Sequence, residues 1–312
     1  MAGTFAHIIL ADTLCREDAL ISKLPTAIQQ ALRNYRPFSK LGAVGPDCPY
    51  VVGSTGATQF ANFMHYLRTA DFVRYAIPKI YEMNFGSSDA RACIAWIFGY
   101  TAHLVTDMTI HPVVSRKCGD YSASAQNRKK HRLCELNQDV YITNKRLGVE
   151  VVASDFLKIS ELDYCAAPRN QHHLNPAIKA LWTYILEQYP RSQTKEYVRL
   201  PKQSLLPDVW YATYVNVFDN VVTKGNGFLK HLGFGYPRLA EVDRGYIDGL
   251  RIADGSTVDY DYVFERALEN VRASWLELSA ALDAGNKDLF TLKNGSLDTG
   301  LADAGGQPIF LV

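Results

Sequence analysis

The sequence is poor in cysteine and lacks the close cysteine pairs of zinc ribbons and redox motifs. A disulfide scaffold is short and dense in cysteine, whereas this chain has 312 residues and no C-x-x-C pair. We therefore expect free thiols, and a zinc site made of cysteines is disfavoured. The six cysteines are Cys15, Cys48, Cys93, Cys118, Cys134 and Cys165.

Long uncharged apolar runs are also missing. A membrane-spanning helix needs roughly 18–20 consecutive apolar residues, and no stretch of the chain approaches that length, so no transmembrane segment is expected. The first residues, MAGTFAHIILADTL, have neither the basic region nor the clean cleavage site of a signal peptide. The sequence therefore favours a cytoplasmic protein, or one exported without a cleavable leader.

Neither basic nor acidic residues are in clear excess. The chain has 33 Lys and Arg against 32 Asp and Glu. Proteins that bind a nucleic-acid duplex through its phosphates are usually more basic, so stable duplex binding is not expected. A small active site for phosphate esters remains compatible with this balance. The composition does not indicate an oligomeric state.

Apolar residues recur mostly at helical spacing, so the predicted fold class is all-α. We expect one domain core over 1–150, followed over 151–312 by its helical continuation or a covering, substrate-selecting subdomain. The C-terminal region is glycine-rich, irregular or strand-containing, and ends in an apolar, strand-like run. The expected helices cover 16–35 (with Pro25 near a start), 57–85 (two, broken at Pro78), 88 to Pro112 (capped by Ser88, with an end or a kink at Pro112), 122–146, 174–190, 206–224 and 263–285, with a loop over 39–50.

One apolar segment, HLVTDMTIHPVV, contains three groups that are costly to bury. His103, Asp107 and His111 are spaced four residues apart, which places them on one stripe of a helix. A buried aspartate needs a cation or hydrogen-bond donors. The stripe therefore indicates a metal site or a set of core polar residues paired with neighbours. His131 and Glu135 repeat this spacing, although the flanking NRKKHR is also typical of a solvated face.

Three further side chains complete a set of candidate metal ligands. His7, Asp47 and His65 add nitrogen and carboxylate donors from the first 65 residues. Zinc with an open water position uses three protein ligands, so the full set suffices for two or three ions. The eight candidates are His7, Asp47, His65, His103, Asp107, His111, His131 and Glu135.

The order of these groups resembles the zinc-dependent phospholipase C family, which is related to the fungal single-strand-specific nucleases. The resemblance rests on GTFAH, GPDCPY, FMHYLRTA, GYTAHLVTDMTIHP and HRLCE, in that order within about residues 1–140. It implies an all-helical domain that holds a three-zinc cluster in a cleft.

The resemblance also implies how the ligands divide. His65, His103 and Asp107 would hold one zinc, with Asp47 beside it, and His111, His131 and Glu135 would hold a second. His7 and a bridging Asp107 would hold the third, together with an N-terminal amine. In this chain that amine belongs to Ala2 if Met1 is removed. Such donor sets also accept Mn, Fe or Ni.

The chemistry implied is phosphodiester hydrolysis by zinc-activated water, most simply of a phospholipid, with transient contact at a membrane surface. Asp47 would orient or deprotonate the water, or serve as a plain ligand or a helix cap. A nuclease or nucleotide phosphatase with the same cluster is one alternative. A binding protein with purely structural zinc is another.

Five further residues lie outside the ligand set. Asp139, one turn beyond Glu135, would orient an imidazole ligand or be an exposed charge. Tyr50 and Tyr100 would line the cleft or pack in the core. His172 and His173 are expected in a surface loop.

Overall fold

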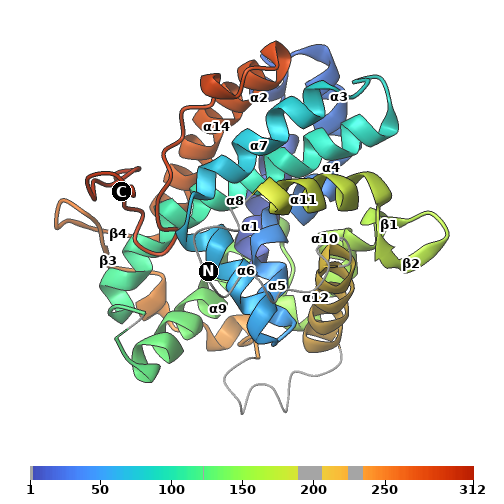
Figure 1. Cartoon of the computed structure of the whole chain (residues 1–312). Coiled ribbons are helices and arrows are strands. Elements are labelled where there is room, and N and C mark those ends of the chain that lie inside the picture. Colours follow the sequence, from blue (N-terminus) through green and yellow to red (C-terminus); the bar gives the residue numbers. More distant parts are fainter. Residues whose placement is uncertain (1–2, 122, 189–205, 224–234) are drawn as a thin grey trace.

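The computed structural model describes residues 3–121, 123–188, 206–223 and 235–312, and helices form nearly all of its regular structure (Figure 1). The all-α class is therefore confirmed. Two antiparallel two-stranded sheets, β1–β2 and β3–β4, lie in the second half of the chain. The first half comprises α1 (Thr4–Cys15), α2 (Asp18–Ile21), α3 (Thr26–Asn34), α4 (Arg36–Val44), η1 (Gly45–Asp47), α5 (Cys48–Val51), α6 (Thr55–Tyr66), α7 (Thr69–Tyr81), α8 (Ser88–Cys118) and α9 (Ala125–Leu147).

The second half contains shorter elements around two long helices, α12 and α14. These elements are η2 (Val151–Ala153), α10 (Phe156–Ser160), η3 (Leu162–Cys165), β1 (Ala166–Ala167), β2 (Asn170–Leu174), α11 (Pro176–Gln188), α12 (Leu206–Thr223), η6 (Leu239–Glu241), η7 (Arg244–Tyr246), β3 (Leu250–Arg251), β4 (Thr257–Val258), α14 (Tyr260–Ala284) and η8 (Lys287–Leu289).

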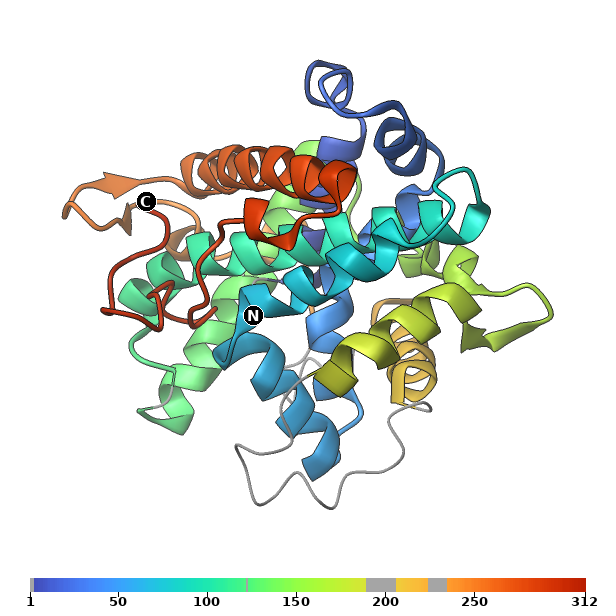
Figure 2. The ribbon, with the colours of Figure 1, turned by 45° about the horizontal axis from the view of Figure 1, so that its top comes forward.

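The central element is α8, which runs through the middle of the molecule with helices packed on several sides (Figure 2). Its sequence is apolar nearly all round, which is typical of a buried helix. The Ser87 hydroxyl accepts the Ala90 N–H at 3.1 Å, so the N-cap is one residue earlier than predicted. The predicted end at Pro112 is wrong, because the helix continues to Cys118. Proline removes only one backbone hydrogen bond, and packing on both sides holds the helix.

A close crossing of α4 and α8 replaces the loop predicted over 39–50. A Cβ atom at Gly99 would overlap the Ser39 carbonyl, and one at Gly42 would overlap the Trp96 carbonyl. The two glycines therefore allow the helices to approach closely and do not mark a turn.

The two prolines of the same segment also fit helices. Pro46 and Pro49 occupy the first turns of η1 and α5, where a missing N–H costs nothing. The loop prediction was therefore wrong because it read glycine and proline only as breakers.

Two other predicted boundaries were misplaced. The range 16–35 splits into α2 and α3, with Pro25 as the N-cap of α3. The range 57–85 does form two helices, but the break lies at Leu67 and Arg68, where Arg68 adopts a left-handed conformation (φ 51°). Pro78 lies inside α7. Pro25 therefore does lie at a helix start, as predicted, whereas Pro78 marked the wrong position for the break in the second segment.

The later helices match the predictions closely. α9 covers the predicted 122–146 from Ala125, and α14 ends at Gly285 in the left-handed conformation (φ 62°) as expected. α11 and α12 match 174–190 and 206–224, whose last residues lie outside the described part of the chain. The final residues form no strand, since the C-terminal region contains only isolated bridges among its described residues.

The C-terminal residues 290–302, here called the C-terminal strap, run across α6, α7 and α8 (Figure 2). The Leu297 N–H donates to the His65 carbonyl at 2.9 Å, and the Thr69 hydroxyl donates to the Gly295 carbonyl at 2.9 Å. Gly300 adopts φ 65°, and a Cβ there would lie 2.6 Å from the Met108 carbonyl. The end of the chain is thus fastened to two helices that carry candidate ligands.

Two expectations from composition agree with the structure. Among the described residues, no helix is long and apolar enough to cross a bilayer. All six cysteines are buried free thiols.

Candidate metal centre

Five elements bring the eight predicted ligands to one place. Seven of the side chains are buried, and that of Glu135 is 14% exposed. The helix stripe on α8 faces the N-terminal helix on one side and α9 on the other, so distant segments converge around it. The ligands are His7 on α1, Asp47 on η1, His65 on α6, His103, Asp107 and His111 on α8, and His131 and Glu135 on α9.

The carboxylate of Asp107 lies at the middle of the cluster. Its Oδ1 is 3.1 Å from Nε2 of His7 and 3.4 Å from Nε2 of His111. Its Oδ2 is 3.3 Å from Nε2 of His103 and 4.0 Å from Nε2 of His65. Each oxygen therefore faces a different pair of imidazoles, as a bridging carboxylate would.

The first group of converging ligand atoms comprises Asp47, His65 and His103, here called the Asp47 group. Oδ1 of Asp47 is 3.1 Å from Nε2 of His65 and 3.8 Å from Nε2 of His103. The resemblance placed Asp47 beside this zinc, and the geometry brings it into the group itself.

The second group comprises His111, His131 and Glu135, here called the Glu135 group. Oε1 of Glu135 is 3.0 Å from Nε2 of His131 and 3.6 Å from Nε2 of His111. The solvated-face reading of His131 and Glu135 is therefore wrong, because the α9 stripe faces α8 and not solvent.

The third group comprises His7, His103 and Asp107, so His103 is shared with the Asp47 group. The rings of His7 and His103 stack with centroids 4.1 Å apart. The additional ligand that the resemblance implied, the amine of Ala2, lies outside the described residues.

The spacing of the donor atoms suits zinc. Four ligands at zinc bond lengths of about 2.0–2.1 Å in a tetrahedron lie about 3.4 Å from one another. Within each group, the ligand atoms all lie within 4.8 Å of one another. Nitrogen and carboxylate oxygen are also the donors that zinc prefers outside cysteine sites. The residues present therefore fit the metal.

Four buried imidazole nitrogens supply a second argument. Nε2 of His7, His103, His111 and His131 makes no hydrogen bond with the part of the chain that the structure describes. Burying a polar atom without a partner is costly, and native proteins rarely do so. All four nitrogens face carboxylates of the cluster, so cations bound at the three groups would satisfy them.

The electrostatics keep the carboxylates ionised. Burial raises the pKa of Asp107, but the imidazoles of His111, His103 and His7 outweigh it and hold the pKa well below its usual range. Burial likewise raises the pKa of Glu135, yet the surrounding positive groups, with His131 among them, lower it to about 2. Metal ligands must be deprotonated, so these shifts favour metal binding near neutral pH.

Backbone carbonyls orient two of the imidazoles. Nδ1 of His103 donates to the Ala43 carbonyl at 2.8 Å, across the close α4–α8 crossing. Nδ1 of His65 donates to the Ala61 carbonyl at 2.7 Å, one turn earlier on α6. Both bonds leave Nε2 facing the cluster, which fixes the tautomer a metal requires.

Sequence reasoning missed Asp298, which lies beside His111. Its Oδ1 is 3.2 Å from Nδ1 of His111, and its Oδ2 accepts the Tyr66 hydroxyl at 2.6 Å. Asp298 sits in a glycine-rich segment with no periodic pattern, so only the presence of an isolated acid near the C-terminus could have drawn attention to it.

The prediction for Asp139 is wrong in both forms. The side chain is fully buried, and among the described residues its hydrogen bonds go to groups other than imidazoles. It accepts the backbone N–H groups of Phe5 at 3.2 Å and Ala6 at 2.8 Å. It also accepts the Tyr236 hydroxyl at 3.0 Å. Asp139 therefore caps the helix that carries His7, a contact between α9 and α1 that spacing along α9 cannot reveal.

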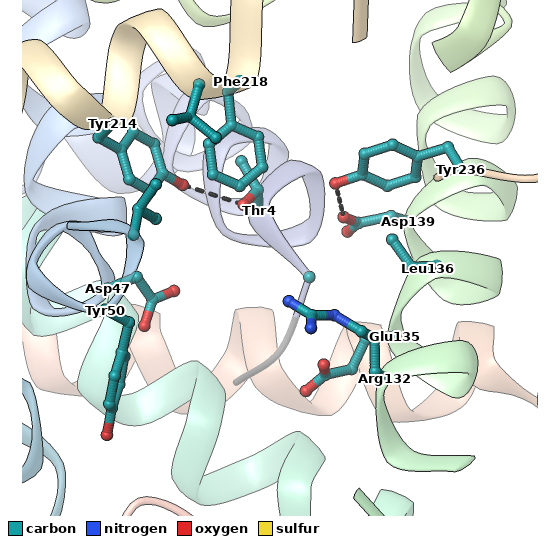
Figure 3. A pocket seen from close by; sticks show the side chains of 13 residues that line it. Thr4, Asp47, Tyr50, Arg132, Glu135, Leu136, Asp139, Tyr214, Phe218 and Tyr236 are labelled. Atoms are coloured by element: carbon teal, nitrogen blue, oxygen red, sulfur yellow. Dashed lines mark hydrogen bonds between the residues drawn. The ribbon is translucent and has the colours of Figure 1, made fainter. Parts of the chain in front are cut away.

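A cavity of about 330 Å³ adjoins the cluster (Figure 3). Asp47 and Glu135 point into it from opposite sides. Tyr214, Phe218 and Tyr236, here called the aromatic wall, close one end. This volume and mixture of apolar surface with a few polar groups are typical of a small-molecule site.

The remaining candidate residues divide between the cavity, the core and the surface. Tyr50 lines the cavity, whereas Tyr100 is fully buried and stacks on Phe72 with ring centroids 4.0 Å apart. His172 and His173 are exposed on β2, outside the three metal groups, in agreement with the surface expectation.

Comparison with known proteins adds one finding. The model of a family described as zinc dependent phospholipase C matches residues 6–191. No curated protein and no solved structure gives a significant match. The matched segment covers more than half of the chain and contains all eight ligands that the geometry brings together. The chain therefore belongs to the zinc-dependent phospholipase C family.

Proposed function

We propose that the chain is a zinc-dependent phosphodiester hydrolase that cleaves the headgroup from a phospholipid. The observation that carries this proposal is the position of Asp47 and Glu135, which belong to two metal groups and also line the adjoining cavity. A phosphodiester in the cavity would thus meet the cluster directly. The eight side chains would hold two or three zinc ions, with Asp107 bridging.

Zinc at these groups supplies Lewis acidity, which activates water near neutral pH and offsets charge on phosphoryl oxygens. The chain's own carboxylates and imidazoles fix where that chemistry happens, because each donor is held by a rigid helix. Asp47 is the proposed catalytic residue. Its carboxylate lies at the cavity wall. Burial raises the pKa of this carboxyl, but His103 and His65 outweigh that effect and lower it. An ionised carboxylate in this position can orient or deprotonate water.

The cavity favours an uncharged or weakly charged organic part beside the phosphate. The aromatic wall and the neighbouring Val51 and Leu136 offer apolar surface for the glycerol side of a lipid. The same wall also supports the second candidate, a nuclease or nucleotide phosphatase, because aromatic rings stack on bases. The near-neutral charge of the chain favours the lipid.

A purely structural role for the metal fits the site less well. Structural zinc is enclosed by four protein ligands. Here two of the candidate ligands face a cavity, and the cluster offers eight donors in three groups.

The proposal is tested by supplying zinc-loaded protein with phosphatidylcholine vesicles, single-stranded DNA and a phosphomonoester. We expect diacylglycerol release from the vesicles. DNA cleavage without lipid hydrolysis would instead support the nuclease. Asp47→Asn is expected to lower the lipid rate by about 100-fold or more, the scale of lost acid–base catalysis.

The controls separate catalysis from folding. Asp18→Asn removes an exposed aspartate and is expected to leave the rate unchanged. Zinc content is measured on all three proteins by atomic emission. If Asp47→Asn retains both zinc and full activity, the catalytic role of Asp47 is wrong.

A further inference from the structure

The His111 ring has two nitrogens with different surroundings. Nε2 faces the cluster, 3.4 Å from Oδ1 of Asp107 and 3.6 Å from Oε1 of Glu135. Nδ1 faces away from the cluster and lies 3.2 Å from Oδ1 of Asp298. A carboxylate can only accept, so with a cation at Nε2 the proton of the neutral ring would sit on Nδ1, where Asp298 accepts it, and Nε2 would offer its lone pair to the metal.

Asp298 is itself held in place. The Tyr66 hydroxyl donates to its second oxygen at 2.6 Å, and its side chain is only 20% exposed. The preceding residue, Leu297, donates its N–H to the His65 carbonyl at 2.9 Å. The C-terminal strap is thus tied to the last turn of α6 at His65 and at the adjacent Tyr66. A displaced Asp298 would have to break these contacts.

The five imidazoles of the centre differ in what holds Nδ1. His65 and His103 use backbone carbonyls. Nδ1 of His7, His111 and His131 makes no hydrogen bond of good geometry with the described residues, but Nδ1 of His111 lies 3.2 Å from a carboxylate oxygen. Among the five, His111 alone faces a carboxylate there. An anionic acceptor raises the basicity of the opposite nitrogen more than a neutral carbonyl does, and such partners change metal affinity 10–100-fold.

We infer that Asp298 is a positioning residue that sets the zinc affinity of the Glu135 group through His111. This inference rests on the metal binding of the proposed function. Asp298 lies beyond residues 6–191, so this contribution comes from outside the segment that the family model matches. The C-terminal strap thereby completes a centre whose ligands all lie in the first half of the chain.

The inference is tested on the full chain by zinc titration against a chelator of known affinity, independently of any substrate. Asp298→Ala is expected to weaken one zinc by about 10–100-fold and leave the others unchanged. Asp298→Asn keeps the shape and an acceptor oxygen but loses the charge. Its zinc affinity at this site is expected to lie between those of wild type and Asp298→Ala. Asp303→Asn changes an exposed aspartate just past the strap and is the matched control.

A second measurement reports the coordination geometry of the metal site and not only its affinity. Cobalt replaces zinc, and its visible spectrum is followed in wild type and variants. We expect a changed band for the weakened site in Asp298→Ala and partial recovery of the wild-type band in Asp298→Asn. If folded Asp298→Ala or Asp298→Asn binds every zinc with wild-type affinity, the inference is wrong while the proposed function stands. If the wild-type chain binds no zinc at all, both are wrong.

Discussion

A single carboxyl, Asp139, holds the first turn of the helix that carries His7. The first N–H groups of a helix have no partner within the helix, and Asp139 accepts two of them from Phe5 and Ala6. A Cβ atom at Gly3 would overlap the carboxyl, so the chain enters α1 with a glycine. Burial raises the pKa of Asp139 to about 7, although these donors partly oppose the shift.

This shift predicts how stability depends on pH. Between the ordinary pKa near 4 and the folded value of about 7, the folded chain keeps a proton that the unfolded chain has lost. The free energy of unfolding therefore falls as pH rises through this window, by about 4 kcal/mol at most for a shift of roughly three units. Asp139→Asn lacks this slope, so it should gain stability relative to wild type with rising pH.

The measurement is urea unfolding of both proteins from pH 4.5 to 8 at saturating zinc. Asp283→Asn, which removes an exposed charge at the end of α14, is expected to follow the wild-type slope. A difference between wild type and Asp139→Asn that stays constant with pH would contradict the prediction.

At the scale of elements, the crossing of α4 and α8 positions one face of the centre. The two helices approach closely because Gly42 and Gly99 have no side chains at the contact. The approach places the Ala43 carbonyl 2.8 Å from Nδ1 of His103. Helix packing and ligand orientation therefore depend on the same pair of glycines.

Gly99→Ala tests this dependence. Its Cβ would overlap the Ser39 carbonyl, and backbone cannot move aside as a flexible side chain does. We expect a loss of about 1–3 kcal/mol in the free energy of unfolding, as in overpacked cores, together with weaker zinc binding at the Asp47 group. Gly86→Ala, where the added methyl meets mainly an exposed Asn84 side chain, is the control and should be nearly neutral. Equal stability of both variants would argue against a tight crossing.

At the scale of the whole molecule, the cluster joins five elements from the first half of the chain, and the C-terminal strap contacts it through Asp298. Without a cation, several buried imidazole nitrogens lie near ionised carboxylates but make no hydrogen bond with the described residues. A metal that binds the folded chain and not the unfolded one adds about 2.7 kcal/mol per site at 100 times its Kd.

Removal of zinc is therefore expected to lower the melting temperature by several degrees or more. Differential scanning calorimetry with EDTA, and then after readdition of zinc or magnesium, measures the effect. Zinc should restore the melting temperature and magnesium should not, because magnesium prefers oxygen ligands. Identical melting with and without zinc would contradict a metal bound in the folded core.

The stripe on α8 and the matching pair on α9 were readable from the sequence, because one helix imposes its own spacing on the side chains it carries. The other three candidate ligands, His7, Asp47 and His65, came from the resemblance, and the structure brings all eight side chains together. The amphipathic α14 and its glycine end were predicted for the same reason. The family followed from the order of the motifs, and the match over 6–191 confirms it.

Only the tertiary structure decided the contacts between distant segments. No local pattern indicates that Asp298 reaches His111 or that Asp139 caps α1, because each contact joins residues far apart in sequence. The glycines of 39–50 look like turn residues until a second helix is packed against them. The sequence alone thus determined the all-helical class, most of the helices and the candidate donors. Tertiary packing determined the helices of 39–50 and the grouping of the donors, because convergence depends on how helices cross and not on periodicity within one of them.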